Sequence, residues 1–178
     1  MVIFYHGAAF DREGLRCNNI AMKALVAFYS RTGNTKKAAE AIAKELGADL
    51  EEIIDHNKRS GIIGWLYAGR DAMKRMLTAI DKPKKDPAAY DLVILGSPLW
   101  AFRSYAPAVR TYMTENRGAF KKVAFFLTKG GSAGDKAIAD MKETCGKHPI
   151  TVLELLEKEV KSGSMADKIG PFCRSLKS

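Results

Sequence analysis

The stretch "FYSRTGNTKKAAEAI", residues 28–42, places a polar loop between an apolar run and a helical pattern. The run that precedes the loop, "ALVAFY" (24–29), is almost continuously apolar, as expected of a strand covered on both faces of a sheet. After the loop, residues 35–46 repeat alanine, isoleucine and leucine at helical spacing. The sequence therefore predicts a strand, a tight loop and a helix in direct succession.

The same alternation continues along the chain. Further strands are predicted at "DLEEII" (49–54), "LVILG" (92–96), "VAFFLT" (123–128) and "ITVLEL" (150–155), with helices at 62–80, 109–113 and 137–141. The segment "MADKIGPFCRSL" (165–176) is compatible with a last helix or with a turn and tail, because Gly170 and Pro171 interrupt it. Repeated strand–helix units predict an α/β fold. We expect a doubly wound, five-stranded parallel sheet of order 2-1-3-4-5 with helices on both faces, a three-layer sandwich.

The length of 178 residues suits one domain, expected at 24–178. Residues 1–23 fit no element of this architecture and are predicted to be an N-terminal extension outside the fold, with an edge strand at 2–5 as the alternative.

No run approaches the roughly 18 apolar residues of a membrane span, and no secretory signal precedes the fold, so a cytoplasmic location is expected. Three cysteines and three histidines without ligand spacing predict neither a disulfide framework nor a metal site.

Positive charge is concentrated in one part of the chain. The net charge is +9, and residues 58–85 contain eight basic residues against two acidic ones. A basic surface attracts anionic partners, although such runs are commonly just a solvated face. No nucleic-acid-binding motif accompanies the charge, so nucleic acid is not an expected partner.

The loop "SRTGNT" (30–35) has two interpretations. Asn34 or Thr35 would serve as an ordinary helix cap. Alternatively, the loop binds phosphate: backbone N–H groups at a helix start point at one anion, Gly33 permits the turn, and Ser30, Thr32 and Thr35 add hydroxyl donors. A cap accounts for one hydroxyl and not for three. The loop matches neither the Walker A pattern nor G-x-G-x-x-G, which disfavours nucleotide triphosphates and dinucleotides.

This loop resembles the T/S-x-T-G-x-T fingerprint of the flavodoxin family, which binds the phosphate of flavin mononucleotide (FMN). The resemblance extends over about residues 24–160 in the order and spacing of elements. It implies FMN as the cofactor. It also implies that the phosphate is bound by Ser30, Arg31, Thr32, Gly33, Asn34 and Thr35.

Two further loops would hold the flavin ring. "GSPLWAFRSYAP" (96–107) is apolar for a loop, and its aromatic side chains either stack on a planar ligand or pack under the following helix. Its start resembles the family pattern G-[ST]-P-[IVL]-W-A, and "TKGG" (128–131) is similar to the family's third flavin loop. The resemblance implies ring or ribityl contacts from Ser97, Pro98, Leu99, Trp100, Ala101, Phe102, Thr128, Lys129, Gly130 and Gly131.

Residues 130–134, "GGSAG", also satisfy the G-x-S-x-G nucleophile elbow. A hydrolase triad would have to form with Asp135 or Asp140 and His148, all within about sixteen residues, whereas triad members come from separate loops. We therefore predict no catalytic residue.

The predicted function is a flavodoxin-like FMN-binding redox protein that carries electrons between partner proteins. One alternative is an NAD(P)H-dependent FMN quinone or acceptor reductase, and a second is a flavin-free binding module acting through its basic face. Most flavodoxins are acidic, so the basic chain favours an acidic redox partner protein or NAD(P)H. The sequence predicts a monomer or a homodimer.

Overall fold

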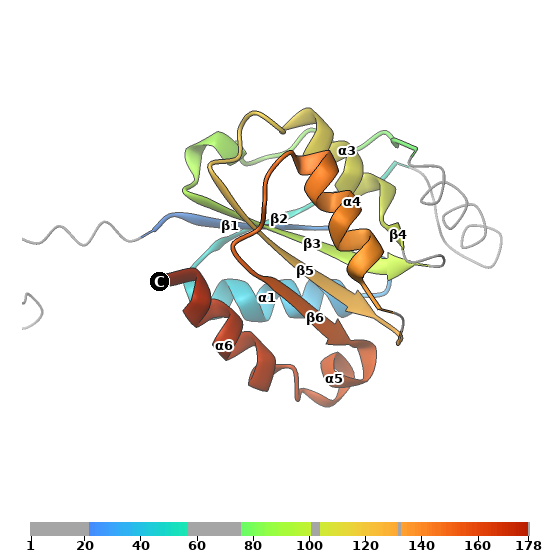
Figure 1. Cartoon of the computed structure of the whole chain (residues 1–178), viewed down its shortest axis with the longest axis vertical. Helices are drawn as coiled ribbons and strands as arrows, with labels where there is room; N and C mark the ends of the chain where they lie inside the picture. Colours follow the sequence, from blue (N-terminus) through green and yellow to red (C-terminus); the bar gives the residue numbers. More distant parts are fainter. Residues whose placement is uncertain (1–21, 57–75, 101–103, 132, 178) are drawn as a thin grey trace, which may run out of the picture.

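A parallel sheet lies between two layers of helices (Figure 1). The computed structural model describes residues 22–56, 76–100, 104–131 and 133–177. Along the chain the elements are β1 (Ala24–Phe28), α1 (Asn34–Leu46), β2 (Asp49–Glu52), η1 (Pro87–Ala89), β3 (Leu92–Trp100), β4 (Ser104–Tyr105), α3 (Pro107–Glu115), β5 (Lys122–Lys129), α4 (Asp135–Cys145), β6 (Val152–Leu156), α5 (Glu157–Ser162) and α6 (Ala166–Lys177).

The strand order is β2-β1-β3-β5-β6, and all four pairings along it are parallel. This confirms the predicted doubly wound α/β fold and its 2-1-3-4-5 order, because β5 and β6 are the fourth and fifth predicted strands. The short strand β4 is an addition that pairs antiparallel with the end of β3. The predicted edge strand at 2–5 and most of the predicted helix at 62–80 lie outside the described residues.

Successive side chains of each central strand point to opposite helical layers. In β1, Leu25 and Ala27 join the core formed with α3 and α4, whereas Val26 and Phe28 join the core formed with α1 and α6. Figure 1 shows the same division, with α3 and α4 on one side of the sheet and α1, α5 and α6 on the other. Every residue of β1 is buried, which explains why its sequence is continuously apolar rather than alternating.

The predicted helix at 62–80 is wrong at its C-terminal end. Residues 76–79 are not helical, and Ile80 forms an antiparallel bridge with Asp55. The backbone N–H of Thr78 donates to the hydroxyl of Thr111 on α3 (3.0 Å), and the Thr78 hydroxyl donates to Asp55 (2.7 Å). These contacts with distant segments replace the local hydrogen bonds of a helix, and a local pattern does not reveal them.

The C-terminal segment forms one helix, α6, which continues through Pro171. Its buried residues Ile169, Phe172, Cys173 and Leu176 pack into the core on the α1 side of the sheet. Burial of this face offsets the loss of one intrahelical hydrogen bond at proline, so the helix is not interrupted. The turn-and-tail alternative is therefore excluded.

We expect Gly96→Ala to lower the free energy of unfolding by about 1–3 kcal/mol, because overpacking displaces neighbours in a dense core. A Cβ at Gly96 would overlap the ring of Phe126, which is fully buried on the adjacent strand β5. Urea denaturation of the protein measures the loss. Gly118→Ala is the matched control, since a Cβ there meets nothing within 4 Å; equal losses in the two variants would contradict the expectation.

Candidate functional site

The carboxyl ends of β1, β3 and β5 meet at one edge of the sheet. Phe28 pairs with Gly96, and Pro98 pairs with Thr128, so the three sequence-predicted loops follow neighbouring strands in register. Ligands of doubly wound sheets bind beyond these strand ends. The fold therefore brings the phosphate-loop, "GSPLWA" and "TKGG" residues that it describes to the same edge.

Helix α1 begins at Asn34, and Gly33 occupies the position before it in a left-handed conformation (φ 87°, ψ −14°). The cap interpretation with Asn34 or Thr35 is wrong, because both residues already belong to the first turn and no side chain of the cap residue forms a capping bond. Instead, the hydroxyl of Ser30 accepts hydrogen bonds from the N–H groups of Gly33 and Lys36, each at 3.2 Å. Ser30 therefore shapes the loop from within.

The start of α1 leaves backbone donors available to an anion. Lys36 N–H is bonded to Ser30, and Lys37 N–H is bonded to the Gly33 carbonyl at 3.0 Å. Within the described part of the chain, no group accepts a hydrogen bond from the N–H of Asn34 or Thr35. The first turn contains no acidic residue, and the side chains of Arg31 and Thr32 are exposed beside it. These donors and the positive end of the helix favour a negatively charged group.

A lysine of the same turn is engaged elsewhere. The ammonium of Lys36 donates to the carboxylate of Glu52 on β2 at 2.8 Å. This hydrogen bond and the negative charge of Glu52 raise the pKa of Lys36 above its ordinary value. The ion pair is exposed and contributes little to stability, but it directs the ammonium toward β2 and away from the backbone donors.

A hydroxyl pair connects the first loop with the third. Thr35 Oγ1 and Thr128 Oγ1 are 2.8 Å apart, and both residues are almost completely buried, at 2% and 3% exposure. One hydroxyl donates to the other, so the accepting hydroxyl keeps its own proton for another acceptor. The pair thus fixes the distance between two loops and retains one donor at their junction.

The second loop begins as an extension of strand β3. Leu99 pairs with Tyr105, and Trp100 pairs with Ser104, so Ser97–Trp100 are strand residues rather than loop residues as predicted. The hydroxyl of Ser97 is fully buried; it accepts from Ala106 N–H (2.9 Å) and donates to the Pro98 carbonyl (3.0 Å). Ser97 therefore braces this hairpin internally. Ala101 and Phe102 lie outside the described residues.

Trp100 packs edge-on against Tyr29, with 6.0 Å between ring centroids and 80° between ring planes. It is half-buried and also contacts the core on the α3 and α4 side. Pro98 and Leu99 are likewise half-buried, so apolar surface remains beside the loop. Tyr29 escaped the sequence-based site prediction; its place between a buried strand and Ser30 is the signal that would have identified it.

The third loop combines an ion pair with two open glycines. Lys129 forms a partly buried salt bridge with Glu154 on β6, so its ammonium is already partnered. Gly130 and Gly131 are exposed, and a Cβ at either position would meet no atom within 4 Å. Packing against the described residues does not demand glycine here, and the space beside both residues is open.

One candidate acid of the G-x-S-x-G alternative forms a salt bridge instead. Asp140, one of the two candidate acids, lies on α4 and forms a buried salt bridge with Arg110 on α3. Gly134 is buried against Glu154 and Leu127, and Ser132 lies outside the described residues. Asp140 thus connects the two helices α3 and α4.

The family model for flavodoxin matches residues 23–169, which is most of the chain. The chain belongs to the flavodoxin family. The search of curated proteins found no significant match. Among solved structures, a flavoprotein from Lactobacillus acidophilus in complex with FMN is 26% identical, with a TM-score of 0.68 over 81% of this chain and 99% of that one.

Two flavodoxins share the fold at lower identity. Two-electron reduced flavodoxin from Megasphaera elsdenii is 16% identical, with a TM-score of 0.56 over 87% of this chain and 99% of that one. Oxidised flavodoxin 2 from Bacillus cereus is 20% identical, with a TM-score of 0.54 over 86% and 96%. The family model confirms the resemblance noted in "SRTGNT" and "GSPLWA" at the level of the family.

In the described ranges, no helix is long and apolar enough to cross a membrane.

We expect Thr35→Val and Thr128→Val each to lower the free energy of unfolding by about 1 kcal/mol, because each leaves a buried hydroxyl without its partner. The double variant should lose clearly less than the sum of the two, since it removes both hydroxyls together. A double-mutant cycle in urea measures the coupling. Strict additivity would show that this hydrogen bond does not connect the loops.

Proposed function

We propose that this flavodoxin-family chain binds FMN at the carboxyl ends of β1, β3 and β5 and carries electrons between partner proteins. The observation that carries the proposal is the start of α1: N–H groups of Asn34 and Thr35 that have no acceptor among the described residues, a left-handed Gly33 and no acidic residue in the first turn. Family membership and the FMN complex of the Lactobacillus acidophilus flavoprotein support the same cofactor.

The residues of the first loop fit a phosphate group. The two N–H donors and the exposed hydroxyl of Thr32 supply hydrogen bonds, and the exposed Arg31 supplies positive charge. Ser30 holds the loop in shape rather than binding the ligand, because its oxygen already accepts two backbone N–H groups. The hydroxyl pair of Thr35 and Thr128 offers one further donor.

The other two loops fit a flat ring. Pro98, Leu99 and Trp100 offer half-buried apolar surface, and Tyr29 holds Trp100 in place from the side. Gly130 and Gly131 are exposed, and a Cβ at either position would meet no atom within 4 Å, so a ligand can approach their backbone closely. FMN, when bound, supplies the electron-transfer chemistry, and the role of the chain is to bind, orient and shield it.

The positive net charge of the chain favours an anionic partner. With a net charge of +9, the protein suits an acidic redox partner, for which long-range attraction accelerates encounter. The same charge also suits the anionic NAD(P)H, so an NAD(P)H-dependent reductase is the second candidate.

A cytoplasmic location is proposed as well, because a reducing compartment keeps buried thiols such as Cys145 and Cys173 free.

We expect the protein to bind FMN far more tightly than riboflavin, which lacks the phosphate. Thr32→Ala should weaken FMN binding about tenfold, the effect of one hydrogen bond to a charged group, and leave riboflavin binding unchanged. Quenching of flavin fluorescence during titration measures both affinities. Thr114→Ala, on the exposed end of α3, is the matched control. Equal affinity for the two flavins would refute the phosphate loop, and no affinity for either would favour the flavin-free module.

The carrier and the reductase differ in how the bound flavin becomes reduced. We expect one equivalent of NADPH under anaerobic conditions to leave the visible flavin absorbance unchanged over minutes, because a carrier accepts electrons from a protein donor. Adding a catalytic amount of a flavodoxin reductase should then bleach the absorbance. Stopped-flow absorbance measures both steps, and rapid bleaching by NADPH alone would establish the reductase instead.

A further inference from the structure

A polar network connects β4 with the two helices on its side of the sheet. It consists of four residues: Tyr105 on β4, Arg110 on α3, and Asp140 and Thr144 on α4. Tyr105 is fully buried and belongs to the apolar core of this layer, and Arg110 is only 4% exposed. The network therefore lies inside the layer formed by α3 and α4, behind the second of the three loops of the proposed flavin site.

The hydroxyl of Thr144 joins three elements through one atom. It donates its proton to the backbone carbonyl of Asp140 (2.9 Å) and accepts from Nη1 of Arg110 (3.0 Å). The hydroxyl oxygen of Tyr105 lies 2.7 Å from the same atom. A hydroxyl has one proton and two lone pairs, so Tyr105 is the donor of this third bond. Thr144 thus uses its full hydrogen-bonding capacity to connect α3 and α4 with β4.

The guanidinium of Arg110 is fixed by three different partners. Its two terminal nitrogens donate to the two carboxylate oxygens of Asp140, with 3.2 Å between Nη1 and Oδ1. It also donates to Thr144 and lies over the ring of Tyr105, with 4.4 Å between Cζ and the ring centroid. The planar fork of arginine can make all these contacts at once, whereas lysine cannot. Tyr105 is consequently held both at its hydroxyl and at its ring.

Tyr105 is one half of the two-residue strand β4, the returning arm of the β3–β4 hairpin. Its backbone pairs with Leu99, and the adjacent Ser104 pairs with Trp100. No described strand other than β3 pairs with β4. A two-stranded hairpin is at best marginally stable by itself, so its position depends on what anchors it. The side chain of Tyr105 provides that anchor on α4, and the strand pairing transmits it to Leu99 and Trp100.

A buried ion pair is a poor device for stability alone. The side chains of Arg110 and Asp140 are 5% and 13% exposed, so both charges lose most of their hydration on folding. Well-packed apolar side chains of similar volume commonly give equal or greater stability at such positions. They do not fix the hydroxyl and ring of Tyr105 in one arrangement, which requires directional bonds. The network thus favours a defined position of β4 over maximal stability.

We propose that Tyr105, Arg110, Asp140 and Thr144 are positioning residues for the isoalloxazine ring: by holding β4 against α4 they set the positions of Leu99 and Trp100. This inference rests on the proposed function, because it assigns the β3–β4 hairpin to the flavin ring. None of the four residues belongs to the phosphate loop after β1. Loss of the network lowers the fraction of molecules whose hairpin is arranged for binding, and the apparent affinity for every ligand with this ring falls by that fraction.

Single hydroxyl deletions in the full chain test the network. Tyr105→Phe and Thr144→Val should each weaken FMN and riboflavin binding by the same factor, about fivefold, so that the ratio of the two affinities is unchanged. Thr144→Ser keeps the hydroxyl and should restore binding. Tyr90→Phe is the matched control, because Tyr90 is also buried but its hydroxyl donates to Asp49 on β2 (2.7 Å); both affinities should stay unchanged. Quenching of flavin fluorescence measures all four variants.

Replacement of the ion pair separates positioning from stability. Arg110→Met combined with Asp140→Leu removes both charges and keeps apolar volume between α3 and α4. We expect the urea midpoint to stay the same or rise, while the affinity for both flavins falls about tenfold. Residues that only pack two helices together would not change stability and flavin affinity in opposite directions. If the double variant does not fold, the hydroxyl variants decide the question.

Three results would overturn the inference in protein shown to be folded by its urea transition. The first is that Tyr105→Phe or Thr144→Val binds both flavins as tightly as the unmodified chain. The second is that either variant weakens FMN binding alone, which would place the effect at the phosphate loop. The third is that Thr144→Ser binds as weakly as Thr144→Val. If the unmodified chain binds neither flavin, the proposed function itself fails, so the two failures are distinguishable.

Discussion

Double-sided burial of the three central strands is the constraint from which the rest of the structure follows. β1, β3 and β5 are apolar along both faces, so helices must cover both, and parallel strands leave their carboxyl ends at one edge. The close approach of Gly96 to the Phe126 ring holds the central pair of strands in register. That register in turn sets which loop residues can meet, including Thr35 and Thr128, which lie 93 positions apart in sequence.

At this edge, hydrogen bonds divide the polar residues into two groups. The first group already has partners within the protein: Ser30 bonds to backbone N–H groups, Ser97 bonds within the β3–β4 hairpin, and Lys129 pairs with Glu154. Within the described residues, the N–H groups of Asn34 and Thr35 and the exposed side chains of Arg31 and Thr32 have no such partner. This division is what an anion-binding loop requires, because donors that are already satisfied hold the shape while unsatisfied ones bind the ligand.

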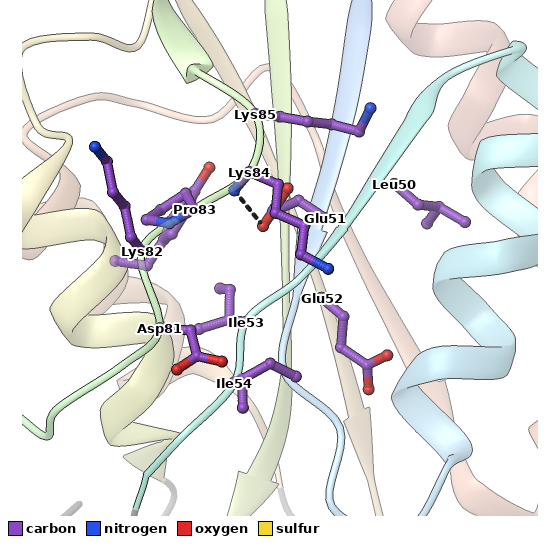
Figure 2. A pocket seen from close by; sticks show the side chains of 11 residues that line it. Leu50, Glu51, Glu52, Ile53, Ile54, Asp81, Lys82, Pro83, Lys84 and Lys85 are labelled. Atoms are coloured by element: carbon purple, nitrogen blue, oxygen red, sulfur yellow. Dashed lines mark hydrogen bonds between the residues drawn. The ribbon is translucent and has the colours of Figure 1, made fainter.

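The outer edge of the sheet is formed by β2, and a returning segment of the chain lies beside it. An edge strand presents unpaired backbone groups. Beyond the end of β2, residues 54–56 are hydrogen-bonded to the returning segment at 79–81, and on β2 itself the side chain of Glu51 accepts from Lys84 N–H (Figure 2). Tyr112, on α3, is fully buried, and among the described residues its hydroxyl has no hydrogen-bond partner.

The sequence by itself determined the fold class, the strand order and the family, because continuous apolar runs, helical periodicity and the "SRTGNT" loop are local patterns that need no knowledge of distant contacts. It also located the three loops that meet at one edge. Only the tertiary structure decided how those residues are used: Gly33 rather than Asn34 or Thr35 precedes α1, Ser97 belongs to a hairpin, and Thr35 bonds to Thr128. It likewise decided that residues 76–79 are not helical and that Thr78 bonds to Thr111 on α3. Each of these outcomes depends on hydrogen bonds or packing between segments far apart in the chain, and such partners leave no periodic signal in the residues themselves.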